Sequence, residues 1–423
     1  MVVQKQVLDN GLHAVAEPIE GKKKVFLHVG IDVGSKNEAS EKKGGAHLLE
    51  HMMFRSNNWR SSDKIAEACE YSGISTNAFT SPVSTVLTFS LPPEKLDLAV
   101  ELAYQAIANT AYDEKEFATE KDGPVTTELV MNERNPRNRF FIRVAIPRVY
   151  DGTPLSDAVI GTFESVRGLS IADMLDLKKR FYVPNNMIVV ATGAVNPEKL
   201  FEAAQKYFAG MSSSPVEQPK IEWKFRPGVC KVEFSDLKDP KKPEQDNAFV
   251  GLVYQCPGSQ EPDSAAVGLL TTMIADGFTS LMFKELRKER GIGYSPQGDY
   301  TSFLNNAIVY LGVPGLHPSR VLESIEVMDG ILAKLRKGDV SSEFVEGKKF
   351  QLVSRIIDGF DSGSSRAGYW IGERFSPSFY DDEKKIEAVR ALSAKQLAEV
   401  AERVFSKEPL VFVASAPGYD IKL

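Results

Sequence analysis

Two histidines and a glutamate near the N-terminus could together perform metal-assisted chemistry. His47, Glu50 and His51 stand in the order His-x-x-Glu-His. On a helix the three share an arc about 100° wide, while the apolar residues of the same run lie on the opposite side. Two neutral imidazoles one turn apart can reach one ion, and the carboxylate can take a proton from water there. Zinc catalysis needs this set, and the order is that of the inverted zinc motif.

The alternative is a pair of histidines that only form hydrogen bonds on a helix surface. A third protein ligand from elsewhere in the chain would favour the metal site, and an acidic helix is the place to look for it. Glu128 lies in such a stretch, residues 121–133. The other histidines, His13, His28 and His317, have no partner at ligand spacing.

With these residues in view, the sequence resembles the pitrilysin/insulysin family of zinc metallopeptidases, in its half-length, processing-peptidase-like branch. The resemblance covers nearly the whole chain. The segments that carry it are Gly44-Gly45-Ala46, the run from His47 to His51, Glu128 at its spacing from His51, Ile160-Gly161-Thr162 and Tyr182-x-Pro184-x-Asn186. It implies that His47, His51 and Glu128 bind one zinc ion per chain. It also implies that Glu50 is the general base that deprotonates the zinc-bound water.

The resemblance further implies where a peptide substrate would bind. Ser75–Thr80 looks like the family's edge strand, so Asn77, Ala78 and Phe79 would pair with an extended substrate backbone. Such pairing suits a peptidase that accepts many sequences, because main-chain hydrogen bonds carry no side-chain code. Without the resemblance, Asn77 is interpreted as a turn residue and Phe79 as a core residue.

In the second half of the chain, Phe283–Gly298 contains Arg287 and Tyr294. They match a pair that grips the substrate and stabilises the transition state in full-length members of the family. Taken alone, such a pair is typical of a solvated helix face. The positions equivalent to the two zinc-motif histidines are Thr271 and Ala275, so no metal ligands are expected there.

One position departs from the family pattern. Seven residues before the third ligand the family usually has a glutamate that supports the site, and here the residue is Lys121. In a regular helix Lys121 lies only about 20° from Glu128, so its ammonium is expected to point at the metal and weaken cation binding. Pro124 removes a backbone hydrogen bond and is expected to kink this helix. The kink would bring Glu120 into the vacant supporting role.

Strand and helix patterns alternate irregularly along the chain, which favours an α+β fold over a doubly wound sheet. The first half predicts a hairpin over residues 2–18, strands over 24–33, 74–79 and 85–91, and helices over 46–54, 62–72, 93–108 and 114–132. After a polar stretch with two prolines, the order of features begins again with a strand over 248–254 and a helix over 265–274.

These features predict two related domains, each a mostly antiparallel sheet flanked by helices. Residues 1–212 would form the zinc-binding catalytic domain and residues 213–225 the linker. Residues 226–423 would form a repeat domain without metal ligands that carries the Arg/Tyr pair.

The composition narrows the classes of function. The chain has 423 residues, 43% of them hydrophobic and 26% charged, which excludes a disordered or collagen-like protein. Its net charge of -6 gives no electrostatic basis for binding nucleic acid. Three cysteines far apart cannot form a disulfide framework. No apolar run is long enough to span a membrane and no signal peptide is evident, so a cytoplasmic protein without a membrane partner is expected.

The expected function is therefore a zinc endopeptidase that cleaves short, unfolded peptides. Two chains would build a closed chamber, with Glu50 of one facing Arg287 and Tyr294 of the other. The dimer would be a homodimer, or a heterodimer with a related non-catalytic chain. Two alternatives stay open: a non-catalytic subunit of the same family, which Lys121 and Pro124 favour, and a peptide-binding scavenger without turnover.

Overall fold

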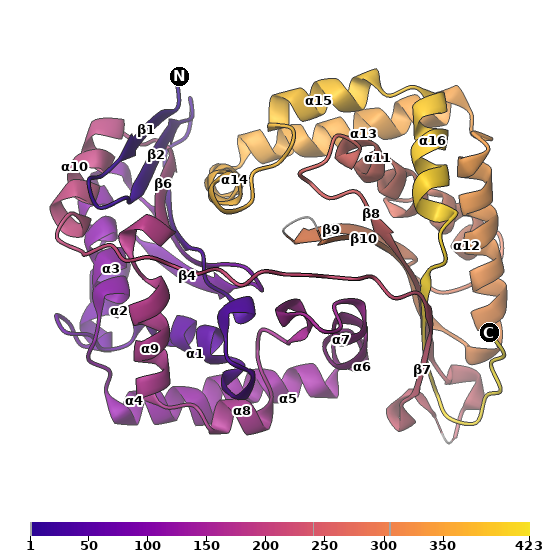
Figure 1. Ribbon diagram of the computed structural model, residues 1–423, viewed down its shortest axis with the longest axis horizontal. Helices are drawn as coiled ribbons and strands as arrows, with labels where there is room; N and C mark the ends of the chain where they lie inside the picture. The colour runs from indigo at the N-terminus through magenta and orange to yellow at the C-terminus, as the bar shows by residue number, and fades with distance from the viewer. Residues whose placement is uncertain (1, 240, 304–305) are drawn as a thin grey trace. The chain divides into compact units, whose positions relative to one another are not determined.

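The computed structural model of the protein describes residues 2–239, 241–303 and 306–423 (Figure 1). These residues form two compact units, and neither is continuous in sequence. Unit 1 comprises residues 1–134, 146–222 and 359–375, and unit 2 comprises residues 135–145, 223–358 and 376–423. The main change from one unit to the other, between Glu222 and Trp223, falls within the stretch interpreted as a linker.

Unit 1 is built on a six-stranded sheet in the order β1-β2-β6-β3-β5-β4. The strands are β1 (Gln4–Val7), β2 (His13–Pro18), β3 (Val25–Ile31), β4 (Ser75–Thr80), β5 (Thr85–Leu91) and β6 (Met187–Gly193). β2 and β6 run parallel, and every other neighbouring pair is antiparallel. The apolar run of β6 is buried along its whole length, whereas β4 alternates between exposed and half-buried side chains, as an edge strand does.

Unit 2 is built on a five-stranded sheet in the order β7-β11-β8-β10-β9. The strands are β7 (Gly228–Glu233), β8 (Ala248–Cys256), β9 (Gln297–Phe303), β10 (Asn306–Leu316) and β11 (Leu410–Ser415). Here β7 and β11 are the parallel pair and the other neighbours are antiparallel. The pattern of directions repeats that of β2-β6-β3-β5-β4 in unit 1. The predicted fold class, two related units with mostly antiparallel sheets flanked by helices, is confirmed.

The helices account for most of the remaining chain. Those of unit 1 are α1 (Gly45–His51), α2 (Ser62–Glu70), α3 (Leu96–Ala108), α4 (Glu114–Glu120), α5 (Thr126–Arg134), α7 (Ile146–Val149), α8 (Phe163–Arg167), α9 (Ile171–Phe181), α10 (Pro197–Phe208) and α14 (Gly363–Phe375). Those assigned wholly or mainly to unit 2 are α6 (Pro136–Phe140), α11 (Ser264–Ala275), α12 (Val321–Arg336), α13 (Ser342–Asp361), α15 (Asp382–Ala391) and α16 (Ala394–Phe405). None of the helices in the described residues is long and apolar enough to cross a membrane.

Each sheet is completed by a helix that the other half of the chain supplies. In unit 1, α14 packs on β3 and β6, where Ala367 and Ile371 join an apolar cluster with Val190. In unit 2, the ring of Phe140 from α6 lies 5.6 Å from the ring of Phe412 and 6.3 Å from that of Phe249. No sequence pattern indicates this reciprocal exchange, because a short amphipathic helix does not reveal which sheet it covers.

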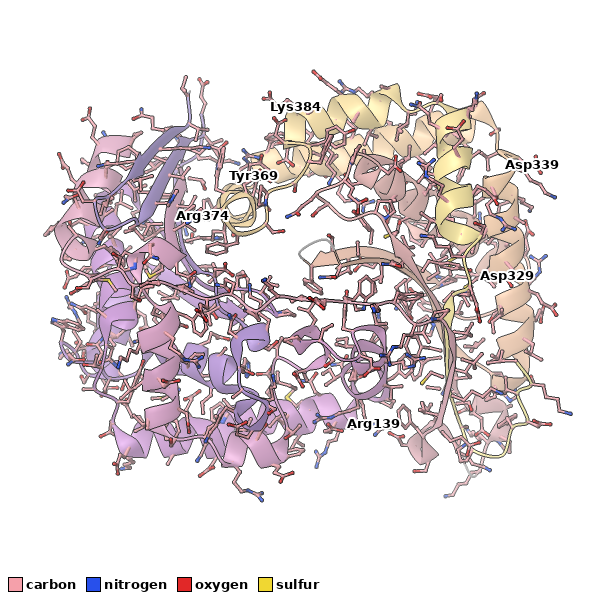
Figure 2. The ribbon with its side chains drawn as sticks, in the orientation of Figure 1. Arg139, Asp329, Asp339, Tyr369, Arg374 and Lys384 are labelled. Carbon is pink, nitrogen blue, oxygen red and sulfur yellow. The ribbon has the colours of Figure 1, made fainter. Side chains whose placement is uncertain are left out.

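Polar contacts hold α14 in place in unit 1. Glu17 on β2 accepts hydrogen bonds from Arg366 Nε (3.1 Å) and Trp370 Nε1 (2.7 Å). At the other end of α14, Arg374, labelled in Figure 2, donates to the carbonyl of Asn185 at 3.3 Å. The helix is therefore an integral part of unit 1, although it is encoded far from the other elements.

We predict that Ile371→Ala lowers the free energy of unfolding of unit 1 by about 2–4 kcal/mol, because it leaves a cavity between α14 and the sheet. The Ile371 side chain is 5% exposed. Ile357→Ala on α13, where the side chain is 41% exposed, is the matched control and should change stability by less than about 0.5 kcal/mol. Urea unfolding followed by circular dichroism measures both. Equal shifts of the two midpoints would contradict the assignment of α14 to the core of unit 1.

Candidate metal centre

Helix α1 carries the zinc motif on one side and apolar residues on the other, as the spacing predicts. Leu48 and Leu49 on the helix, and Met52 and Met53 in the turn directly after it, are fully buried in the core of unit 1. The helix begins at Gly44, which adopts a left-handed conformation with φ of 88°. A Cβ at this position would come within 3.0 Å of the Ile160 carbonyl, so the close approach also requires glycine.

The structure brings His47, His51 and Glu128 together. The Glu128 Oε2 atom lies 3.4 Å from His47 Nε2 and 3.7 Å from His51 Nε2. One ligand atom from each residue lies within 4.8 Å of the other two. Ligands about 2.0–2.1 Å from a tetrahedral zinc ion lie roughly 3.3 Å from one another. The two distances to Glu128 are close to this spacing, and the widest separation, up to 4.8 Å, would have to shorten when the ion binds. Hydrogen bonds from the two imidazoles hold the pKa of the Glu128 carboxyl well below its usual range, which keeps it an anionic ligand.

Glu120 lies against the outer nitrogen of His51. Its Oε1 atom is 3.0 Å from His51 Nδ1, and its Oε2 atom accepts a hydrogen bond from Arg55 Nη2. A carboxylate on the far side of a metal-binding histidine fixes the ring and its tautomer and makes the ligand more basic. Burial lowers the pKa of His51, but the hydrogen bonds to Glu128 and Glu120 outweigh it, and the net shift is upward. Arg55 was missed in the sequence, although a cation four residues after a candidate ligand is a usable signal.

A π-helical stretch explains why the supporting carboxylate is Glu120 and not the residue at position 121. Between α4 and α5, residues Lys121–Val125 form a π-helix around Pro124. A π turn contains one more residue than an α turn. Glu120, eight residues before Glu128, therefore occupies the position that Lys121, seven residues before it, would have in a regular helix. The expectation that Lys121 points at the metal is wrong. Its ammonium donates to the carbonyls of Arg167 (3.3 Å) and Leu169 (3.2 Å).

Glu50 lies on α1 between the two histidines, and its carboxylate is tied to the sheet. Its Oε2 atom accepts a hydrogen bond from Thr80 Oγ1 at 3.3 Å. Burial raises the pKa of Glu50, while the two imidazoles and the Thr80 hydroxyl oppose the shift. We call His47, His51 and Glu128 together the metal group. A carboxylate with a raised pKa beside such a group is suited to accept a proton from water near neutral pH. Thr80 has no distinctive sequence signal, and only the fold shows its contact with Glu50.

Thr80 is the last residue of β4, which places an open sheet edge next to Glu50. β4 pairs only with β5, so its other edge has no strand partner among the described residues. Asn77 lies within this strand, opposite Thr88, and the Phe79 side chain is 48% exposed. The interpretations of Asn77 as a turn residue and Phe79 as a core residue are therefore wrong, and the edge strand that the resemblance implies is present.

Arg287 and Tyr294 lie in unit 2 and contact each other. The guanidinium carbon of Arg287 is 4.2 Å from the centre of the Tyr294 ring and 4.8 Å from that of Phe283. The Tyr294 side chain is 76% exposed and, with Arg287, lines a groove of about 400 Å³ whose other lining residues are 291–293, 315–317 and 320. Thr271 and Ala275, the positions equivalent to the two zinc-motif histidines, lie in α11. Among the described residues, one group of three possible metal ligands is found, that of His47, His51 and Glu128.

Two family models match the chain, one in each half. A model described as "Insulinase (Peptidase family M16)" matches residues 14–162, and one described as "Peptidase M16 inactive domain" matches residues 168–352. The chain belongs to peptidase family M16. The metal group lies within the first matched range, and Arg287 and Tyr294 lie within the second.

Three relatives illustrate the range of the M16 family. The chain is 24% identical over 411 residues to an uncharacterized zinc protease of Mycobacterium leprae, covering 96% of this chain and 90% of that one. It is 28% identical over 275 residues to subunit 1 of the mitochondrial cytochrome b-c1 complex of Rattus norvegicus, covering 64% and 55% of the two chains. The crystal structure of a protease from Helicobacter pylori has the same fold, with a TM-score of 0.88 at 22% identity over 99% of both chains.

We predict that Glu120→Gln lowers the affinity for zinc about 10- to 100-fold, because a neutral amide supports His51 less strongly than a carboxylate. Competition with a chromogenic chelator measures the affinity. Glu114→Gln, an exposed position on the same helix, is the control and should have no effect. Lys121→Met should change the affinity by less than about twofold, because the ammonium is bonded elsewhere. A gain of tenfold or more in that variant would show that Lys121 does oppose the cation.

Proposed function

We propose that this chain is a zinc-dependent endopeptidase that hydrolyses short, unfolded peptides. The observation that carries the proposal is one arrangement in unit 1. Three side chains that could hold a metal ion, the carboxylate of Glu50 and the end of an open edge strand lie together, and a hydrogen bond from Thr80 joins the strand to Glu50. The names of the relatives support peptidase chemistry at the level of the family.

The three possible metal ligands, Glu50 and Thr80 divide the tasks of this chemistry among them. His47, His51 and Glu128 would hold one zinc ion, which supplies a Lewis acid that polarises the scissile carbonyl and makes water more acidic. Glu50 accepts a proton from the attacking water and returns it to the amine that leaves. The hydroxyl of Thr80 orients the Glu50 carboxylate for both transfers.

The substrate would bind as an added strand on β4. The outer edge of β4 offers backbone donors and acceptors to an extended chain, and Asn77, Ala78 and Phe79 line it. Because β4 ends beside Glu50, a peptide paired with it in register has one peptide bond near the carboxylate. Only an unfolded segment can pair in this way, since a folded chain has already used its backbone groups.

Arg287 and Tyr294 would contact the substrate from a second chain, so that two chains form a chamber. Stacking on Tyr294 and Phe283 holds the guanidinium of Arg287, and its N–H groups suit carbonyl or carboxylate oxygens of a peptide. A homodimer has both sets of residues. A heterodimer with a related non-catalytic chain is the close alternative.

A cytoplasmic location and the lack of nucleic-acid or membrane partners stay predictions from the sequence.

A non-catalytic subunit is the second candidate function. The similarity to a cytochrome b-c1 complex subunit favours it, as does the description of the model that matches residues 168–352. The complete donor set and Glu50 favour the peptidase, because a chain that serves only as scaffold does not need three metal ligands converging on one point.

We predict that the purified chain cleaves a quenched, unstructured peptide only when zinc is present, and that Glu50→Gln lowers kcat about 10²- to 10⁴-fold. Zinc affinity should stay within about threefold of the wild type, since Glu50 is not a ligand. Glu70→Gln on α2, an exposed position, is the control and should retain full turnover. If the zinc-loaded wild type binds peptides without cleaving them, the scavenger or scaffold function is favoured instead.

We also predict that two inactive variants complement each other. Glu50→Gln lacks the base and Arg287→Ala lacks the substrate contact, so each homodimer has no intact site. In a refolded equimolar mixture, half of the dimers are mixed and each has one intact site. The mixture should therefore recover about a quarter of the wild-type rate. Absence of recovery, or a wild type that is a fully active monomer by size-exclusion chromatography with light scattering, would exclude the two-chain chamber.

A further inference from the structure

The helix that carries the zinc motif has no cap of its own. Gly44 at its N-cap has no side chain, so the first N–H groups of α1 need acceptors from elsewhere. Glu38, from the loop before the helix, supplies them. Its Oε2 atom accepts from Gly44 N at 2.9 Å, and its Oε1 atom accepts from Ala46 N at 2.6 Å. Both oxygens of one carboxylate therefore hold the first turn of α1.

The loop that presents Glu38 is itself fixed. Lys43 donates to the Glu38 carbonyl at 3.1 Å and pairs with Asp157 at 2.7 Å. The Asn37 side chain accepts from Gly34 N at 3.1 Å and closes the preceding turn. Glu38 is thus held at its backbone while its side chain binds the helix.

Glu38 caps the helix with a carboxylate that is largely removed from water, which costs desolvation free energy. Its side chain is buried, with the residue only 9% exposed. Burial raises the pKa of Glu38 to about 7, against the opposing effect of the two backbone N–H groups and Lys43. A serine or aspartate, the usual N-cap residue, does not fit at position 44, because Gly44 has a left-handed φ of 88° and a Cβ there would come within 3.0 Å of the Ile160 carbonyl. The acceptors for this turn therefore come from Glu38, which links the preceding loop to the start of α1.

The two histidines of the metal group differ in what orients them. His51 has Glu120 against its Nδ1 atom. The Nδ1 atom of His47 is buried and has no hydrogen-bond partner among the described residues. Apart from its contacts with Glu128 and with the His51 ring, whose centroid is 4.7 Å away, the His47 ring is directed by the backbone of α1. His47 directly follows Ala46, whose N–H donates to Glu38.

We propose that Glu38 is a positioning residue for the metal centre, which fixes the first turn of α1 and through it the direction of His47. Glu38 would do for His47, through the backbone, what Glu120 does for His51 through a side chain. The proposal rests on the zinc site of the proposed function, and the test separates the two.

The test compares zinc affinity with stability in variants of the full chain. Glu38→Gln keeps the size of the side chain but has one amide oxygen for two N–H donors, and Glu38→Ala removes both acceptors. We expect the zinc affinity of Glu38→Gln to fall at least tenfold by chelator competition. The d–d absorption bands of its Co²⁺-loaded form should shift or broaden, because the direction of one imidazole changes.

Two control variants separate positioning from loss of stability. Ile371→Ala destabilises unit 1 from the other face of the sheet, and Asp381→Asn removes a carboxylate that accepts Lys384 N (2.8 Å) at the start of α15 in unit 2. Both should bind zinc within about twofold of the wild type, with an unchanged Co²⁺ spectrum. The thermal midpoints of the metal-free proteins show how much stability each variant has lost.

Each outcome then bears on one claim. Wild-type affinity and spectrum in folded Glu38→Gln would overturn the positioning role, and so would an equal loss of affinity in Ile371→Ala at the same loss of stability. A wild type that binds no zinc would overturn the proposed function first, and the Glu38 proposal with it. If Glu38→Ala does not fold, Glu38→Gln still decides.

Discussion

A helix of seven residues does not hold its own direction in water, and α1 is that short. The candidate chemistry of this protein depends on it, because α1 carries two of the three candidate metal ligands and the candidate base. The helix is therefore held from outside along its length. Its apolar side is buried in the core of unit 1, Glu38 and the close approach of Ile160 hold its first turn, and Glu120 holds His51 at its end.

The second constraint lies in the helical segment that supplies the other carboxylates. Glu120 must reach the Nδ1 atom of His51, while Glu128 must reach the Nε2 atoms of both His47 and His51. Glu128 is the eighth residue after Glu120, and the π-helical turn around Pro124 places both carboxylates at the histidines despite this spacing. The backbone irregularity thus belongs to the construction of the site, and Lys121 is directed to the carbonyls of Arg167 and Leu169.

The two units share one sheet pattern but are not equivalent in chemistry. Unit 1 has the metal group and the open edge of β4, and unit 2 has Arg287 stacked on Tyr294. Each also contains a helix from the other half of the chain, since α14 covers the first sheet and α6 the second. Loss of either helix would expose apolar sheet surface, so this exchange makes each half dependent on the other for a complete core.

The sequence by itself determined the elements and the chemistry of α1. The spacing of His47, Glu50 and His51, with apolar residues on the other side, is a local property that a helix converts directly into a shared face. The repeated order of strands and helices likewise predicted two related units. The resemblance to a family, carried by a few short segments, added Glu128 and the edge strand.

Only the tertiary structure decided what depends on distant segments or on a departure from regular geometry. The regular-helix assumption placed Lys121 at the metal, and a single π turn reversed that conclusion. Three other features join residues that share no periodicity in the sequence. They are the hydrogen bond from Ala46 N to Glu38, the hydrogen bond from Thr80 to Glu50, and the packing of α14 on the first sheet. Periodicity reports which face of an element is apolar, but the partner that meets that face is set by packing of the whole chain.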